Sequence, residues 1–200
     1  MARISDPGTR GRSRRTLLWV ATAIILGSVA WVASNEIAER YAYGFEKVSI
    51  SGVPNAGRIN ARLYRGGQPT NAGLAALRSL GVDTIVSFTL EGDGARAEAE
   101  AVRALGMQYI HLPWSANSLP PDNYLDQFLD LTTPARERVV FAHCKSGSDR
   151  TGLMVAAYRV RSDGWTPDHA LEEMGAFGYE AEFHPQLRRF VRGLAPPHLR

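Results

Sequence analysis

One stretch of ten residues holds the chain's single cysteine and an arginine six positions after it. The stretch runs His143-Cys144-Lys145-Ser146-Gly147-Ser148-Asp149-Arg150-Thr151-Gly152. A thiolate is a strong nucleophile, and the planar guanidinium of arginine can hold two oxygens of a phosphate at once. The small residues at 146–148 allow the backbone to curl, so that several amide groups point at one anion. The stretch therefore predicts a nucleophile, Cys144, inside a phosphate-sized anion site completed by Arg150.

The segments on either side of this stretch must position it, and their patterns predict a strand and a helix. Residues 138–142 are apolar and rich in β-branched and aromatic side chains, as in a central strand of a parallel sheet. Residues 151–162 carry apolar side chains at helical spacing. The loop between them would lie at the amino end of a helix, where free amide groups and the helix dipole favour anions. The same field favours thiolate over thiol, so we expect a lowered pKa for Cys144.

The ten residues resemble the signature of the cysteine-dependent protein tyrosine and dual-specificity phosphatases, in which His-Cys, five residues, Arg and Ser/Thr-Gly recur. The lysine after the cysteine and the Asp-Arg-Thr-Gly ending are most similar to the bacterial dual-specificity-like branch. Residues 63–70 and 82–88 resemble the amino-terminal part of that branch. The alternative, an inert buried cysteine beside a surface arginine, does not explain why His143, Gly147 and Thr151 also match.

The resemblance implies a two-step hydrolysis that uses no metal and no cofactor. Cys144 attacks phosphorus, and water then hydrolyses the phosphocysteine intermediate. Arg150 and the loop backbone stabilise the phosphate oxygens, while Thr151 donates a hydrogen bond to the leaving sulfur and His143 orders the loop. The residues that the resemblance assigns to phosphate binding are Lys145, Ser146, Gly147, Ser148 and Arg150.

The general acid is the point at which the sequence departs from the family pattern. These phosphatases usually carry an aspartate on the loop after the preceding strand, where it protonates the leaving oxygen. The corresponding segment here, residues 111–121, contains no carboxylate. Two candidates remain: Asp149, since myotubularin-type phosphatases have an aspartate just before the signature arginine, and Asp122, which equally fits the first turn of a helix. We favour Asp149, although a substrate with a good leaving group needs no acid.

Positive charge is concentrated at the amino terminus. The 200 residues are 44% hydrophobic and 22% charged, which fits one catalytic domain, residues 36–200, with an appendage. Residues 1–15 form a basic tail with five arginines and one acid, so the rest of the chain is nearly neutral although the formal net charge is +3. This distribution argues against a nucleic-acid partner.

Residues 16–35 contain no charged side chain and are long enough to cross a bilayer as a helix. Trp19 and Trp31 lie near the two ends, as interfacial anchors do. The arginines before this segment predict a single-pass membrane anchor with the catalytic domain on the non-cytoplasmic, periplasmic side. The alternatives are a cleaved signal, which would export the domain, and a buried core helix.

The remaining pattern alternates strands and helices, which predicts an α/β fold with a central, mostly parallel sheet flanked by helices, like that of the dual-specificity phosphatases. In such a sheet the loops after Phe88, Leu112 and Ala142 open on one edge. The predicted strands are 45–50, 62–64, 84–88, 107–112 and 138–142, and the predicted helices are 70–80, 95–105, 123–131, 151–162, 167–174 and 184–194.

The leading hypothesis for function is a phosphatase acting on phosphorylated protein, at tyrosine or at serine and threonine. A lipid or sugar phosphate is the alternative substrate class, and Lys145 would help to select its charge. A catalytically poor phosphate-binding module and a rhodanese-type sulfurtransferase are lower alternatives. Arg65, which follows a short predicted strand, either touches substrate phosphate or is a solvated or structural arginine. The sequence leaves the oligomeric state open.

Overall fold

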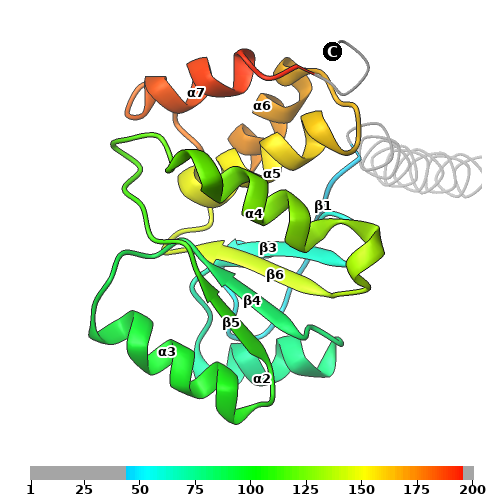
Figure 1. The fold of residues 1–200 in the computed structure, drawn as a ribbon, viewed down its shortest axis with the longest axis vertical. Coiled ribbons are helices and arrows are strands. Elements are labelled where there is room, and N and C mark those ends of the chain that lie inside the picture. The colour runs from blue at the N-terminus through cyan, green and yellow to red at the C-terminus, as the bar shows by residue number, and fades with distance from the viewer. Residues whose placement is uncertain (1–43, 196–200) are drawn as a thin grey trace, which may run out of the picture. The chain divides into compact units, whose positions relative to one another are not determined.

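A six-stranded sheet carries Cys144 at the end of one of its central strands (Figure 1). This computed structural model describes residues 44–195, and within them the strand order is β1-β2-β3-β6-β4-β5. The pairs β3–β6, β6–β4 and β4–β5 are parallel, whereas β1–β2 and β2–β3 are antiparallel. The strands are β1 (Glu46–Lys47), β2 (Gly57–Arg58), β3 (Leu63–Gly67), β4 (Thr84–Ser87), β5 (Gln108–His111) and β6 (Val140–Cys144).

Helices cover both faces of this sheet (Figure 1). Because successive strand residues point to opposite faces, Ile85 and Phe141 pack in the cluster on the α2 and α3 side, while Val86 and Ala142 pack in the cluster on the α5 side. The predicted α/β fold is therefore confirmed as a mixed sheet flanked by helices. The helices are α2 (Asn71–Ser79), α3 (Asp93–Ala104), α4 (Asp122–Thr132), α5 (Asp149–Arg161), α6 (Pro167–Ala176) and α7 (Pro185–Arg192), with a short 3-10 turn, η1 (Pro134–Arg136).

Helix α5, which begins in the ten-residue signature, is enclosed by the rest of the fold. Every residue from 151 to 160 is buried, so the helix has no solvent-exposed face over most of its length. Its first turn is continuous with the loop, because the amide of Gly152 donates to the carbonyl of Ser148 at 2.8 Å. A helix fixed on all sides holds the amide groups at its amino end in one place, which an anion site requires.

The first two strands are where the prediction was incomplete. The predicted strand 45–50 contains only Glu46–Lys47, and Gly57–Arg58 is a strand that the sequence did not predict. Two-residue strands are too short to show an alternating pattern. At Gly57 a Cβ atom would come within 2.4 Å of the Phe177 ring, so close packing explains the glycine. Short connections allow only antiparallel pairing between β1, β2 and β3, so the sheet is mixed, with parallel pairing at β3–β6, β6–β4 and β4–β5.

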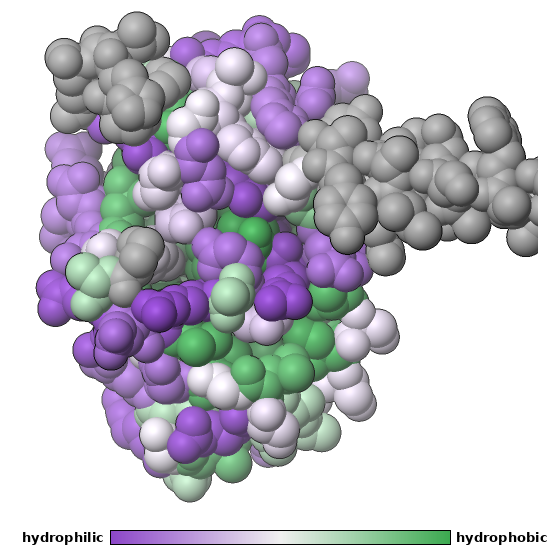
Figure 2. All heavy atoms as spheres, turned by 90° about the vertical axis from the view of Figure 1, so that its right-hand side faces the viewer, coloured by the Kyte–Doolittle hydropathy of each residue, from purple (hydrophilic) through white to green (hydrophobic). Residues whose placement is uncertain are grey.

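The carboxyl ends of β3, β4, β5 and β6 meet at one edge of the sheet, as expected for the loops after Phe88, Leu112 and Ala142 (Figure 1). Figure 2 shows the side of the molecule at the opposite edge, with mainly hydrophilic residues above and a hydrophobic band across the lower half. The signature loop therefore opens away from the surface seen in that view.

The basic tail, residues 1–15, and the apolar segment, residues 16–35, lie outside the described residues, as do residues 36–43 at the start of the predicted catalytic domain. From residue 44 to residue 195, no helix combines the length and hydrophobicity needed to cross a bilayer.

Candidate active site

The signature forms a tight loop between β6 and α5. Strand β6 ends at Cys144 and α5 begins at Asp149. The Cys144 side chain is buried, and its Sγ atom accepts a hydrogen bond from the Gly147 amide at 3.3 Å. Gly147 has a φ of +79°, and a Cβ atom there would lie 2.5 Å from the carbonyl carbon of Gly66 on β3. Only glycine fits this position, because the loop turns directly against the neighbouring strand.

The surroundings of Cys144 favour the thiolate. Burial by itself raises the pKa of a thiol, but the Thr151 hydroxyl and amide, the Arg150 charge and the Gly147 amide together outweigh burial and lower the pKa of Cys144. Thr151 is fully buried in the first turn of α5, where its hydroxyl has no other hydrogen-bond partner among the described residues. The surroundings of the expected nucleophile therefore favour its thiolate form through groups of the signature itself.

Cys144 should react with iodoacetate at a lower pH than an ordinary cysteine, whose pKa is about 8.5. A lowered pKa keeps the thiolate populated as the pH falls, so the midpoint of the inactivation rate against pH should lie below that value. Thr151→Ala should move the midpoint upward, because it removes one of the groups that stabilise the negative charge. Thr132→Ala is the matched control, since the Thr132 hydroxyl bonds only within α4. A wild-type midpoint at or above the ordinary value would contradict the prediction.

Arg150 is oriented by the loops that follow β4 and β5. Its Nη1 atom donates to the carbonyl oxygen of Phe88 at 2.6 Å and to that of Trp114 at 3.3 Å. Among residues 44–195, no acceptor is bonded to its Nε or Nη2 atom. The guanidinium is thus fixed by one nitrogen and keeps two N–H groups on another edge, an arrangement suited to two oxygens of a phosphate.

His143 is buried behind the loop and belongs to a polar cluster that the sequence analysis missed. Its Nδ1 atom lies 3.3 Å from the carbonyl oxygen of Cys144, and its Nε2 atom lies 3.4 Å from Oε1 of Glu98 on α3. The Tyr109 hydroxyl donates to Oε2 of Glu98 at 3.0 Å. Burial raises the pKa of Glu98, but His143 and the neighbouring hydrogen bonds outweigh it and lower the pKa. The sequence did contain one sign of this cluster: Glu98 lies among the residues that form the buried face of α3, namely Ala95, Ala99 and Val102.

The remaining loop residues differ in exposure. Lys145 and Ser146 are exposed, whereas Ser148 is buried and shares a 2.7 Å hydrogen bond with the Ser146 hydroxyl. Arg65 is completely buried, and its Nη2 atom donates to the Gly147 carbonyl oxygen at 2.8 Å. Of the roles considered for Arg65, the buried position fits the structural one, and fits neither contact with substrate nor a solvated side chain.

The two candidate acids have different surroundings. Asp149 is the first residue of α5 and accepts a hydrogen bond from the Ser148 hydroxyl at 3.1 Å. It lines a hollow of about 230 Å³ together with Gly178, Glu180, Phe183 and His184. Asp122 is the exposed first residue of α4, and its carboxylate has no bonded partner among the described residues. The structure thus places Asp149 beside the loop in a hollow and Asp122 at a helix start.

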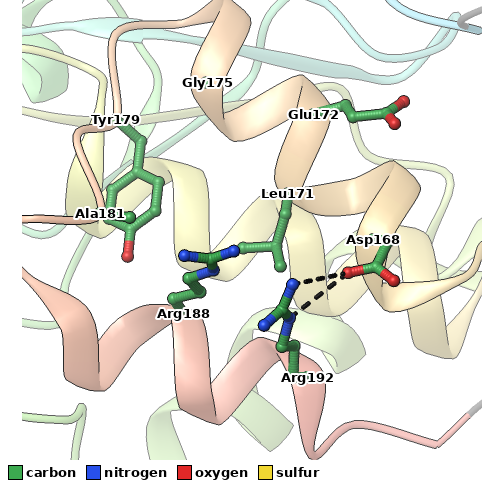
Figure 3. A pocket seen from close by; sticks show the side chains of 8 residues that line it. All are labelled: Asp168, Leu171, Glu172, Gly175, Tyr179, Ala181, Arg188 and Arg192. Atoms are coloured by element: carbon green, nitrogen blue, oxygen red, sulfur yellow. Dashed lines mark hydrogen bonds and ion pairs between the residues drawn. The ribbon is translucent and has the colours of Figure 1, made fainter.

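A larger hollow, of about 530 Å³, lies between α6 and α7 (Figure 3). Arg188 and Arg192 extend from α7 toward it, and Arg192 pairs with Asp168 of α6 at 3.3 Å. None of its lining residues belongs to the signature. Within residues 44–195 no group of three or more histidine, cysteine, aspartate or glutamate side chains is placed to hold a metal ion.

Comparison with known proteins finds similarity to cysteine-dependent phosphatases over most of the described residues. The family model described as a DSP-PTPase phosphatase fused to NAD+ kinase matches residues 45–186. The dual specificity protein phosphatase TpbA of Pseudomonas aeruginosa is 37% identical over 141 residues, which cover 70% of this chain and 62% of TpbA. The chain therefore spans less than two thirds of that relative.

Two further proteins extend the comparison. A crystal structure of P. aeruginosa TpbA in complex with pTyr is 31% identical, with a TM-score of 0.63, and the match covers 76% of this chain and 90% of that one. The phosphatidylglycerophosphatase and protein-tyrosine phosphatase 1 of Rattus norvegicus is 32% identical over 60 residues, 28% of this chain and 31% of its own length.

Proposed function

Because the chain belongs to the DSP-PTPase family of cysteine-dependent phosphatases, we propose that it hydrolyses phosphate monoesters through a phosphocysteine intermediate on Cys144. The observation that carries the proposal is the arrangement at one loop. The Cys144 sulfur accepts a hydrogen bond from the Gly147 amide at 3.3 Å, and the surrounding donors lower the pKa of the Cys144 thiol. Arg150 keeps two N–H groups available for an anion.

The proposed reaction has two steps. In the first, the Cys144 thiolate forms a bond to phosphorus as the bond to the leaving oxygen breaks, and that oxygen takes a proton. In the second, water attacks phosphorus, inorganic phosphate is released and the thiolate is restored. Arg150 and the amides of residues 145–148 hold the equatorial oxygens in both steps. Thr151 stabilises the sulfur as it leaves, and His143 orders the loop through its contact with the Cys144 carbonyl oxygen on the buried side.

Phosphorylated protein is the substrate class that we favour, with phosphotyrosine first. The complex of TpbA with pTyr supports it, and so does an exposed aromatic side chain in the hollow that Asp149 lines. Phe183 is 72% exposed and lines the same hollow as Asp149, where it would lie beside an aryl leaving group. A lipid phosphate is the second candidate, which the name of the rat relative supports.

A phosphate-release panel on the full chain tests this proposal. It compares a phosphotyrosine peptide, a phosphoserine peptide and vesicles containing phosphatidylglycerophosphate at equal phosphate concentration. Fastest release from the phosphotyrosine peptide would support the favoured class, and fastest release from vesicles would support the second. Phosphate binding without release from any of them would identify a catalytically poor binding module.

Asp149 is the general acid that we propose, because it is the carboxylate within the signature itself, next to Arg150, and it lines a hollow at the surface. Asp149→Asn should lower kcat about 10²- to 10⁴-fold for phosphotyrosine, whose leaving oxygen needs a proton. The loss should be much smaller for 4-nitrophenyl phosphate, whose leaving group is stable as an anion. Steady-state kinetics on the two substrates measures this difference.

Asp122→Asn is the matched variant, since it removes the rival carboxylate at the exposed start of α4. It should retain near wild-type kcat for both substrates. If Asp122→Asn shows the leaving-group dependence and Asp149→Asn does not, the assignment of the acid is wrong.

A further inference from the structure

Arg65 lies on the strand beside the nucleophile, yet it does not reach solvent. Strand β3 pairs with β6 in parallel, with Arg65 opposite Ala142 and Gly67 opposite Cys144. The Arg65 side chain has no exposed surface. A buried guanidinium is costly unless it is paired and hydrogen-bonded, so its position calls for a role.

The Arg65 guanidinium contacts the centre of the signature loop from the interior of the protein. Because this loop would hold the substrate phosphate, residues 144–150 are called the phosphate loop below. Its Nη2 atom donates to the carbonyl oxygen of Gly147 at 2.8 Å, while the amide of the same glycine donates to the Cys144 sulfur at 3.3 Å. The two bonds fix both sides of one residue. With its carbonyl turned inward to Arg65, Gly147 is oriented so that its N–H group, and not its oxygen, serves the anion site.

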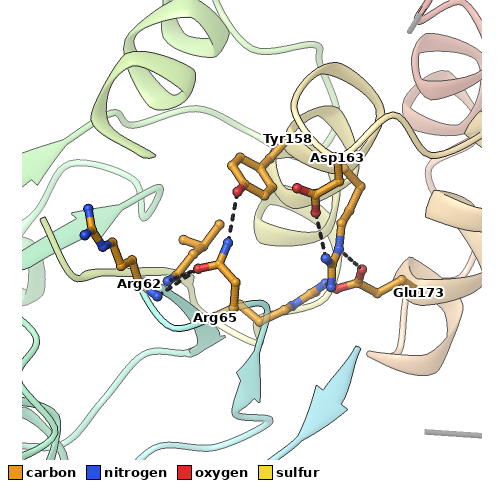
Figure 4. Close-up of polar contacts among 8 residues, drawn as sticks. Arg62, Arg65, Tyr158, Asp163 and Glu173 are labelled. Carbon is orange, nitrogen blue, oxygen red and sulfur yellow. Dashed lines mark hydrogen bonds and ion pairs between the residues drawn. The ribbon is translucent and has the colours of Figure 1, made fainter. Parts of the chain in front are cut away.

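A cluster of paired charges holds Arg65 in place (Figure 4). Its Nη1 atom lies 3.5 Å from Oε1 of Glu173, and the other oxygen of Glu173 accepts from Nε of Arg159 at 2.8 Å. Arg159 also pairs with Asp163 at 2.8 Å. The Phe177 ring lies 3.9 Å from the Arg65 guanidinium carbon and covers it. Arg65 is therefore held directly by Glu173 of α6 while it bonds to the loop, whereas Asp163 pairs with Arg159 and not with Arg65.

Arg65 keeps its positive charge in this environment. Burial lowers the pKa of Arg65 to about 10, against the opposing effect of Glu173, so the guanidinium stays protonated at neutral pH. The charges of Arg65 and Cys144 also favour each other. Charges interact more strongly inside a protein than in water, so a cation behind the loop acts on the sulfur and on a bound phosphate.

We propose that Arg65 is a positioning residue of the phosphate loop, which turns the Gly147 carbonyl away from the anion site and places a buried positive charge behind the nucleophile. The proposal rests on the proposed phosphatase function for its consequence in turnover. The thiolate and the anion site are both observable without turnover. Lysine would supply the charge but not the planar fork that joins the Gly147 carbonyl and Glu173 at once.

The test compares Arg65→Met, Arg65→Lys and the matched control Asp163→Asn in the full chain. Asp163 belongs to the same charge cluster through Arg159 but does not touch the loop. Three quantities are measured: the pH midpoint of iodoacetate inactivation, the affinity for vanadate as a phosphate-like oxyanion, and kcat/KM for 4-nitrophenyl phosphate. Thermal melting shows whether each variant is folded.

Arg65→Met should move the pH midpoint of iodoacetate inactivation upward and weaken vanadate binding. It should also lower kcat/KM about tenfold, which is the factor that corresponds to a shift of one pKa unit. Arg65→Lys should keep the midpoint and weaken vanadate binding several-fold, because the charge stays but the carbonyl loses its donor. Asp163→Asn should match the wild type in all three measurements.

A folded Arg65→Met variant with the wild-type midpoint and vanadate affinity overturns the proposal. If that variant does not fold, Arg65→Lys decides, since wild-type vanadate affinity in it also overturns the proposal. Absence of phosphate release from the wild-type protein would refute the proposed function alone, because inactivation and vanadate binding still test Arg65.

Discussion

Cys144→Ser is expected to lower phosphate release from 4-nitrophenyl phosphate by at least about four orders of magnitude. Removal of a nucleophile that forms a covalent intermediate eliminates the enzymatic route, and only binding and oxyanion stabilisation remain. The serine hydroxyl has almost the same size, but it is a far weaker acid than a thiol, whereas the surroundings of Cys144 lower its pKa and favour the thiolate. Continuous measurement of released nitrophenolate gives the rate.

The anion site should survive this substitution. The amides of the loop and the two free N–H groups of Arg150 do not depend on the sulfur, so Cys144→Ser should still bind vanadate or phosphate. Cys144→Ala is the matched variant, because it lacks any nucleophile and should lose as much activity as the serine form. Turnover within tenfold of the wild type in either variant would show that the sulfur does not carry the reaction.

The signature loop was predictable because its parts are contiguous in sequence. A strand, a loop of small residues and a helix follow one another from residue 140 to residue 161, so the position of Cys144 and Arg150 between a strand and a helix follows from local pattern. The prediction differed at the boundaries: it ended the strand at 142 and began the helix at 151, whereas the strand reaches Cys144 and the helix begins at Asp149. The loops after β4 and β5 were placed by the general geometry of parallel strands. Arg150 bonds to the carbonyls of Phe88 and Trp114 in those loops.

The support behind the loop was not predictable in the same way. Arg65 and Glu98 are distant from Cys144 in sequence, and each is a charged residue that ordinarily lies at the surface. Their burial depends on register, because Arg65 reaches Gly147 only when β3 pairs beside β6 with Gly67 opposite Cys144. Glu98 reaches His143 only because α3 packs across the sheet. Pairing between distant segments is a property of the assembled fold.

The 111–121 segment contains no aspartate, and what it does instead depends on packing. The structure adds that this segment contributes the Trp114 carbonyl to Arg150 and that Gln186 on α7 holds it through the Ala116 carbonyl at 2.7 Å. The segment therefore positions Arg150, the residue that we propose binds phosphate. The proposed acid, Asp149, lies instead in the signature itself, beside a hollow completed by residues that precede α7.

Arg150→Lys is expected to lower kcat about 10²- to 10³-fold, the cost of losing a donor aimed at charge that develops in the transition state. A lysine can supply one point charge, whereas Arg150 combines two carbonyl bonds through Nη1 with two further N–H groups for the phosphate. Arg150→Met should lose more and should also raise the pKa of Cys144, because the Arg150 charge is one of the groups that lower it. Kinetics against pH separates the two effects.

Gln186→Ala is the matched control for the structural part of this loss. It releases the same 111–121 segment at Ala116 and removes no group from the anion site, so kcat should stay within a few-fold of the wild type. If Arg150→Lys falls no further than Gln186→Ala, the arginine acts by holding the loops and not by stabilising the phosphate. A large loss in Arg150→Lys with a small one in Gln186→Ala would place its N–H groups on the reacting phosphate, because loop positioning is the only role that the two residues share.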